Sequence, residues 1–214
     1  MKNKSLFWIL VIAMAVTVVV SNILVQYLFG SWLTWAAFTY PIAFLVTDIA
    51  NRLLGTAKAR QIILCGFIAG IFCSVLASLL TNEEGIPYTT LRIALGSGLA
   101  FFAAQMTDIY IFKKLQAAAW WKAPFTSTVL GSVIDSVIFF SVAFSLLFVF
   151  LEPTNDISWA NEQLPLLGIW FTAPLWMSLA VADFGVKVSI GLLALLPFQY
   201  TTRRIKMESP QELI

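Results

Sequence analysis

Residues 6–28, LFWILVIAMAVTVVVSNILVQYL, carry no charged side chain, and this unbroken apolar stretch decides the fold class. The hydrocarbon core of a bilayer is about 30 Å thick, and a helix crosses it in roughly 20 residues. Lys2 and Lys4 precede the stretch, as in a signal peptide, but it is long and lacks a convincing small-x-small cleavage site. We therefore interpret it as a first membrane span.

Five further apolar stretches of similar length follow, separated by short polar breaks. The predicted spans are residues 6–28, 31–51, 61–80, 89–112, 124–150 and 170–198. The composition agrees, since 60% of the 214 residues are hydrophobic, 11% are charged, and the mean hydropathy is +0.88. The sequence predicts an all-α integral membrane protein with six transmembrane helices in one domain, residues 1–214, and no room for a soluble domain.

Basic residues indicate the orientation, because Lys and Arg in short loops stay on the cytoplasmic side. Of the 13 basic residues, 11 lie at the start of the chain, between the second and third spans, after the fourth, or after the sixth. The loops at 81–88 and 152–163 contain acidic residues and no basic residue. We expect both termini to be cytoplasmic, in a multi-pass protein of a bacterial inner membrane.

The stretch from residue 164 to 198 is longer than one bilayer crossing requires at 1.5 Å per residue. Pro165, Gly168 and Pro174 interrupt its first part. We expect an interfacial or re-entrant piece ahead of the true sixth span.

Small residues recur every four positions in the third and fourth predicted spans. They are Gly66, Gly70, Ser74 and Ser78, then Gly96, Ala100 and Ala104. Such stripes let helices approach closely. Packing within one chain and a homodimer interface both account for them, and the former is the more common.

Charged residues inside the predicted spans point to function, because an ionised side chain at the bilayer centre costs roughly 2.5–3.5 kcal/mol. Asp135 and Asp183 lie near mid-span, whereas Asp48 and Asp108 lie close to the basic ends. Asp183 and Lys187 are four residues apart and share a helix face. They could form a structural ion pair, but intramembrane charges more often mark a pathway.

Two helix faces combine aromatic rings with polar groups. The first presents Tyr40, Phe44 and Asp48, and the second presents Phe101, Gln105 and Asp108. Pro41 permits a kink in the first of these helices, which ends with Asn51 and Arg52. Arg52 could bind ligand or simply reach the cytoplasmic surface. Rings, amides and carboxylates together suit a flat, nitrogen-rich ligand with a guanine-like edge.

Several chemistries have no residues to support them. The chain has no His, no G-x-x-x-x-G-K-[ST] nucleotide-binding loop and no Asp-rich metal motif. Cys65 and Cys73 lie in one apolar stretch and cannot bridge along one helix. We expect neither a metal nor another cofactor, and no enzymatic activity.

Five segments, in order between residues 39 and 198, resemble the queuosine precursor transporter family, also called the vitamin uptake transporter family. They are Thr39-Tyr40-Pro41 to Asn51-Arg52-Leu53, Ala94-Leu95 to Asp108, Trp120-Trp121-Lys122-Ala123-Pro124, Gly131-Ser132 to Phe139-Phe140, and Ala182-Asp183 with Lys187. The resemblance implies uptake of 7-cyano- and 7-aminomethyl-7-deazaguanine, from which the queuosine of tRNA is made. It implies a small-molecule substrate and no nucleic-acid partner.

Our hypothesis is a secondary carrier whose substrate site combines the residues of both faces. The candidate substrate-binding residues are Tyr40, Phe44, Asp48, Asn51, Arg52, Phe101, Gln105 and Asp108, and the candidates for charge coupling are Asp135, Asp183 and Lys187. One alternative is the substrate-binding membrane subunit of an energy-coupling vitamin importer. Another is a membrane enzyme acting on lipid-linked substrates, which the missing catalytic groups disfavour.

Overall fold

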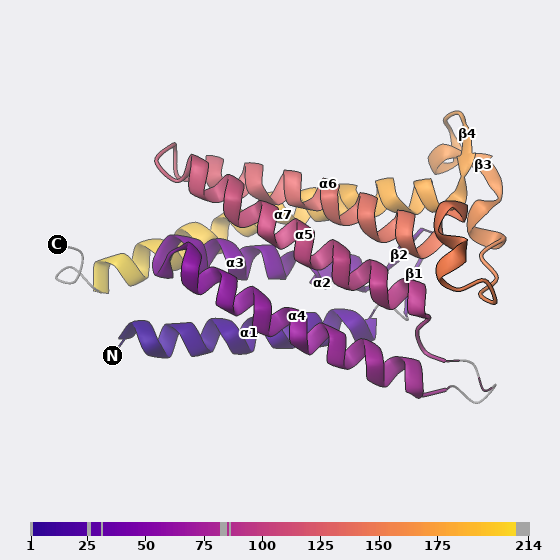
Figure 1. Ribbon diagram of the computed structural model, residues 1–214. Coiled ribbons are helices and arrows are strands. Elements are labelled where there is room, and N and C mark those ends of the chain that lie inside the picture. Colours follow the sequence, from indigo (N-terminus) through magenta and orange to yellow (C-terminus); the bar gives the residue numbers. More distant parts are fainter. Residues whose placement is uncertain (1, 25–26, 31, 82–84, 86, 209–214) are drawn as a thin grey trace.

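The computed structural model describes residues 2–24, 27–30, 32–81, 85 and 87–208, and its long helices lie side by side in a bundle (Figure 1). The long helices are α1 (Lys2–Leu24), α4 (Thr56–Leu79), α5 (Leu91–Leu115), α6 (Lys122–Phe144) and α7 (Leu175–Glu208). Among the described residues these 5 helices are long and apolar enough to cross a membrane. The prediction of an all-α membrane protein is confirmed at this level.

The predicted second span is a broken helix, made of α2 (Ala36–Thr39) and α3 (Pro41–Leu54). Tyr40 keeps helical angles between them, with φ −58° and ψ −37°. The hydrogen-bond ladder is interrupted because Pro41 has no N–H to donate. The expected kink position is thus a real break, but a membrane crossing by α2 and α3 stays a prediction.

The helix boundaries differ from the predicted spans at α4, which begins at Thr56 rather than at residue 61, and more clearly at α6 and α7. Helix α6 ends at Phe144 rather than at residue 150, because Ser145 is extended and a 3-10 helix, η1 (Leu146–Leu151), follows. Helix α7 begins at Leu175 rather than at residue 170, and continues past 198 to Glu208, with Pro197 inside it. Hydropathy located the apolar run, but the polar end of this helix extends beyond that run.

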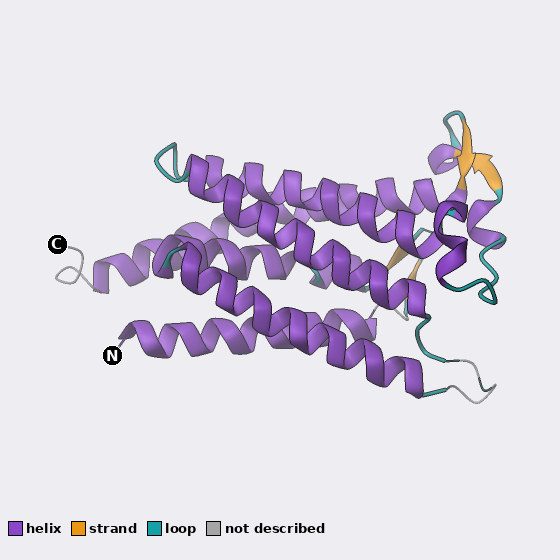
Figure 2. Ribbon diagram, in the orientation of Figure 1, coloured by secondary structure: helices purple, strands orange, loops and turns teal. Residues whose placement is uncertain are grey.

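The residues ahead of α7 form a small hairpin instead of a helix. Strand β3 (Gln163–Pro165) pairs antiparallel with β4 (Thr172–Pro174), and the 3-10 helices η2 (Trp159–Asn161) and η3 (Leu166–Gly168) flank β3. The turn uses positive φ angles at Leu167 and Gly168, 52° and 80°. A second hairpin joins β1 (Leu28–Phe29) to β2 (Leu33–Thr34). Figure 2 shows both strand pairs at the same end of the bundle.

The opposite end of the bundle gathers the start of α1, the end of α7, the α3–α4 turn at Gly55 and the α5–α6 loop (Figure 1). These are the segments that carry the 11 clustered basic residues. We call this the basic end, and the end with the hairpins the acidic end. Glu83 and Glu84, two of the predicted acidic-loop residues, lie outside the described residues, as do residues 25, 26 and 31 of the first two predicted spans.

Glycines of the predicted stripes are used for packing inside the chain. A Cβ on Gly66 would lie 2.5 Å from Met14 Cγ, and one on Gly70 would lie 3.1 Å from Val18 Cγ1, both on α1. A Cβ on Gly96 would lie 3.2 Å from the Phe139 carbonyl on α6. These contacts confirm packing within one chain at the three glycines. The exterior is apolar, as Phe72 and Leu196 illustrate with 64% and 69% exposure.

Candidate functional site

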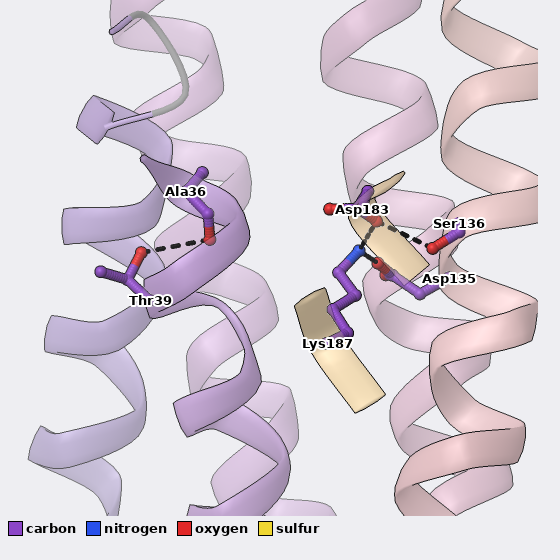
Figure 3. Close-up of polar contacts among 6 residues, drawn as sticks. All are labelled: Ala36, Thr39, Asp135, Ser136, Asp183 and Lys187. Atoms are coloured by element: carbon purple, nitrogen blue, oxygen red, sulfur yellow. Dashed lines mark hydrogen bonds and ion pairs between the residues drawn. The ribbon is translucent and has the colours of Figure 1, made fainter. Parts of the chain in front are cut away.

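Three charged side chains meet between α6 and α7, and Figure 3 shows them in contact. Lys187 Nζ donates to Asp135 Oδ2 at 2.5 Å and also to Asp183 Oδ2, and the Ser136 hydroxyl donates to Asp183 at 2.8 Å. All four side chains are buried. We call Asp135, Ser136, Asp183 and Lys187 the paired cluster. The predicted Asp183–Lys187 pair is present, and Asp135 joins it from the neighbouring helix.

The paired cluster holds two carboxylates for one ammonium. When all three groups are ionised, the cluster keeps one excess negative charge inside the bundle, where such a charge is costly. The Tyr40 ring adds a polarisable surface, with Lys187 Nζ 5.3 Å from its centroid. A proton or a cationic ligand group would therefore be stabilised here.

A second polar cluster lies between α3 and α5 and contains Asp48, Asn51, Gln105 and Asp108. All four side chains are at most 5% exposed. The Thr47 hydroxyl donates to Gln105 Oε1 at 2.6 Å and so fixes the amide across the helix interface. We call Asp48, Asn51, Gln105 and Asp108 the unpaired cluster. The structure thus brings four of the predicted substrate-binding residues together.

Many polar atoms of the unpaired cluster lack a hydrogen-bond partner among the described residues. They are both side-chain atoms of the Asn51 amide, Gln105 Nε2 and both oxygens of Asp108. Buried polar atoms in folded proteins nearly always have a partner, and leaving one without costs about 1–3 kcal/mol. Five such atoms in one place therefore indicate a site built for donors and acceptors that a ligand or water supplies.

Helix α6 completes this cluster with two hydroxyls. Ser127 donates to Asp48 Oδ1 at 3.2 Å, and Thr128 donates to Asp48 Oδ2 at 3.5 Å. The carboxylates of Asp48 and Asp108 are close enough to interact electrostatically, and Ser127 lies near Asp108 without forming a hydrogen bond to it. Two neighbouring carboxylates with few donors would attract a ligand that carries adjacent N–H groups.

The two clusters lie about 12 Å apart along the bundle. This is the helical rise over the eight residues from Tyr40, whose ring lies beside Lys187, to Asp48. Phe44 fills the interval. A Cβ on Gly131 would lie only 2.7 Å from Phe44 Cε1, so this ring packs directly on the backbone of α6. The Ser132 hydroxyl, fully buried and without a partner among the described residues, lies one turn from Thr128 and from Ser136.

Arg52 lies on the basic-end side of the unpaired cluster rather than inside it. Its guanidinium carbon lies 5.1 Å from the centroid of the Phe112 ring and 5.9 Å from that of Phe198. Its Nη1 donates to the Gln116 carbonyl at 3.1 Å. The side chain therefore connects α3 to α5 and α7 and covers the unpaired cluster from the basic end.

A cleft of about 440 Å³ lies between α1, α4 and α5. Its mouth includes Thr89 and Glu152 near the acidic end, and its inner part reaches Tyr40 and Phe101. Those two rings contact each other edge to face, with centroids 6.1 Å apart and planes at 78°. Tyr40 and Phe101 thus line an open space, whereas Phe44 does not.

Arg92 fixes the outer wall of this cleft. Its fully buried guanidinium donates to the carbonyls of Val142 and Ser145 at 3.1 and 2.6 Å, where α6 ends. Its backbone N–H donates to Glu152 Oε2 at 3.2 Å. A cation at a helix C-terminus is favourable because the last carbonyls there lack helical partners. Arg92 therefore has a positioning role at the acidic end.

Sequence reasoning did not select Thr47, Ser127, Thr128, Ser132 or Ser136 as site residues. A signal was present in α6, where Thr128, Ser132 and Asp135 with Ser136 recur at helical spacing in an otherwise apolar stretch. Such a polar stripe must face the interior of a membrane bundle. Ser127 and Thr47 carry no comparable signal, since single hydroxyls are common in transmembrane helices.

Comparison with known proteins adds an independent line of evidence. A family profile described as "Putative vitamin uptake transporter" matches residues 34–202. An Escherichia coli K12 protein named "Queuosine precursor transporter" is 32% identical over 209 residues, which cover 92% of this chain and 85% of the relative. A "Probable queuosine precursor transporter" of Haemophilus influenzae is 29% identical over 191 residues, covering 85% of this chain and 73% of the relative. No solved structure matches the chain significantly.

Proposed function

We propose that this chain, which belongs to the vitamin uptake transporter family, imports queuosine precursors into the cytoplasm for the modification of tRNA. The substrates are 7-deazaguanine bases, the 7-cyano and 7-aminomethyl compounds. The observation that carries the proposal is the unpaired cluster, whose five partnerless polar atoms match the donors and acceptors of a guanine-like edge. No chemical change of the substrate is required.

Each group of site residues has its own task in this proposal. The Asp48 and Asp108 carboxylates accept from the ring N–H and exocyclic amine of the base, and the amides of Asn51 and Gln105 donate to its carbonyl. Tyr40 and Phe101 offer rings for stacking. Phe44 packs beside the site, and Arg52 closes its basic-end side.

The orientation follows from the basic end, which we place in the cytoplasm with both termini. The broken helix of α2 and α3, which is the second predicted span, then adds a sixth crossing to the five long helices, in a bacterial inner membrane. Broken helices are common at transporter sites, because their free backbone groups can face a polar cavity. The transport unit is the single chain, in line with the intrachain use of Gly66, Gly70 and Gly96.

The paired cluster supplies charge coupling. Its excess negative charge favours binding of one proton, which makes the chain a secondary carrier. An importer subunit of an energy-coupling complex is the competing arrangement. Uptake by this chain alone, in a host without an energy-coupling module, separates the two.

The test uses bacteria that can neither make nor import queuosine precursors. With wild-type chain and a low external concentration of either precursor, tRNA queuosine should reappear, and Asp48→Asn should greatly reduce it. Ser189→Ala, at an exposed position of α7, is the matched control and should behave as wild type. If wild type leaves the tRNA as unmodified as Asp48→Asn does, this chain alone does not transport the precursors.

A further inference from the structure

The function proposed so far uses only the Tyr40 and Phe101 rings of the cleft between α1, α4 and α5. We propose that it is an entry site, which receives a planar, N–H-bearing base from the acidic end and holds it against Tyr40 and Phe101 before the unpaired cluster binds it. This inference rests on the proposed transport function. It divides the predicted substrate site into two stations in series.

Volume distinguishes the cleft from the hollow beside Asp48. The cleft encloses about 440 Å³, within the roughly 300–1,000 Å³ typical of small-molecule sites. The hollow that Asp48 borders, between α3, α6 and α7, has only about 10 Å³, which is room for about one water molecule, and Asn51, Gln105 and Asp108 do not line it. Of these two spaces, only the cleft can accept a base without movement of the helices.

The lining of the cleft is mostly apolar, but it includes polar groups that a lipid tail could not satisfy. Asn22, Ser74, Thr89 and Ser97 offer an amide and hydroxyls, and Glu152 adds a carboxylate at the mouth. Hydrocarbon cannot bond to such groups, so lipid would leave them without partners. A heteroaromatic base can satisfy them and still contact the apolar parts of the wall.

The inner end of the cleft lies beside both clusters. From Thr90 to Phe101 the helix descends about 16 Å, roughly half of the hydrocarbon thickness. Beyond the rings, Gln105 follows Phe101 by one turn, and Lys187 lies beside the Tyr40 ring. The edge-to-face pair of Tyr40 and Phe101 therefore separates the cleft from the charged interior, and its movement would connect them.

The basic end is closed in the same conformation. Arg52 lies against Phe112 and Phe198, whose own ring centroids are 6.2 Å apart, and bonds to the Gln116 carbonyl. A carrier must open its two ends alternately. An open cleft at the acidic end with a closed basic end is the state that accepts substrate from outside.

Thiol labelling tests the entry site. Ser97→Cys is placed in a chain in which Cys65 and Cys73, the two cysteines, are replaced by Ala. A membrane-impermeant methanethiosulfonate reagent is added from outside, with or without 7-cyano-7-deazaguanine. We expect labelling to reduce uptake at least tenfold and the base to slow labelling severalfold. Ser189→Cys, on the exposed side of α7, is the matched control and should show neither effect.

Each outcome decides the inference. Labelling of Ser97→Cys that is unaffected by the base and leaves uptake intact would show that the cleft is not on the path, while transport itself stands. Absence of labelling from outside would show that lipid or protein fills the cleft, and would also overturn the inference. If wild type does not transport, the proposed function fails; if only the Cys-free chain does not transport, protection of Ser97→Cys by the base still tests binding in the cleft.

A filling substitution gives a second test without a reagent. A Cβ on Gly98 would meet only Phe67 Cε2 at an ordinary 3.6 Å, so Gly98→Ala should keep full uptake. Gly98→Phe should occupy the cleft and lower uptake at least tenfold, with an unchanged amount of protein in the membrane. Equal uptake by the two variants, both present in the membrane, would contradict an entry route through the cleft.

Discussion

The paired and unpaired clusters are both buried in the same bundle, yet they differ in whether their polar side chains have hydrogen-bond partners. Each carboxylate of the paired cluster bonds to Lys187, and Asp183 receives a further bond from Ser136. In the unpaired cluster, Asp108 and Asn51 have no hydrogen-bond partner among the described residues. The paired cluster has the satisfied contacts of a structural or coupling element, whereas the unpaired cluster has polar atoms that are available to a ligand.

The difference teaches that burial of charge alone does not identify a binding residue. Breaking a satisfied buried pair removes stability, because the remaining partner becomes an uncompensated charge. Removing a group that has no partner should leave the stability of the fold unchanged and weaken only the binding of the ligand. Substitutions in the two clusters should therefore separate stability from transport.

The largest effect is expected from Lys187→Met, which leaves Asp135 and Asp183 facing each other without a cation. Loss of one partner of a buried ion pair costs about 3–5 kcal/mol, so both the melting temperature in detergent and the amount of protein in the membrane should fall strongly. Uptake should be lost with them.

A triple variant sharpens this prediction. Lys187→Met combined with Asp135→Asn and Asp183→Asn removes all three charges and should recover most of the thermal stability. If coupling resides in the paired cluster, uptake should stay absent in the recovered protein. A single Lys187→Met variant as stable as wild type would contradict the ion-pair network.

The next largest effect is expected from Asp108→Asn, and only on transport. Neither Asp108 oxygen has a partner to lose, and the change removes a like charge beside Asp48, so the melting temperature should stay the same or rise. A hydrogen bond to a charged group contributes about 1.5–3 kcal/mol, so precursor uptake should fall roughly 10- to 100-fold. Stability and radiolabelled precursor uptake are measured on the same preparation.

Asp135→Asn is the matched control for Asp108→Asn, because it neutralises a buried acid of the same kind that does have a partner. It should lower the melting temperature where Asp108→Asn does not, because the loss of the charge-assisted bond from Lys187 outweighs the relief of the excess negative charge. If the two variants lose stability equally, the distinction between the clusters is wrong.

Much of this arrangement could be predicted from the sequence, because hydropathy and intramembrane charge are strong signals in lipid. The helical membrane class follows from hydropathy, the break follows from Pro41, and the Asp183–Lys187 pair follows from its four-residue spacing. The partners across helices do not. That Asp135 shares Lys187, or that Thr47 holds Gln105, depends on helix rotation and packing, which spacing within one helix does not encode.

The placement of Arg52 and Phe44 shows the same limit. Phe44 belongs to the predicted face and Arg52 was predicted at the end of the same helix, yet Phe44 packs on Gly131, and Arg52 lies against Phe112 and Phe198. A helix face spans more than one environment along its length, so residues with correct spacing can lie in different layers. The hairpin ahead of α7 was likewise visible only as an interruption by Pro165, Gly168 and Pro174.

A moderate effect is expected from Thr47→Val, which keeps the side-chain shape and removes the hydroxyl that orients Gln105. The net value of one such hydrogen bond is about 0.5–1.5 kcal/mol, so KM for the precursor should rise roughly 2- to 10-fold with a similar maximal rate. Thr202→Val is the control, since the buried Thr202 hydroxyl bonds only within its own helix. Equal kinetics for both variants would exclude an orienting role for Thr47.

The smallest effect is expected from Asp156→Asn, which changes an acid outside the membrane-spanning helices. The backbone N–H of Ser158 donates to Asp156 Oδ1 at 2.9 Å and, together with the Ser158 hydroxyl, lowers the pKa of this carboxyl below its ordinary 3.8. A lowered pKa stabilises the fold above the ordinary value, and this contribution disappears as the pH falls through the lowered pKa. Wild type and Asp156→Asn should therefore differ slightly in melting temperature at neutral pH and converge below pH 3.8. Uptake at neutral pH should be unchanged, because Asp156 belongs to neither buried cluster and does not line the cleft.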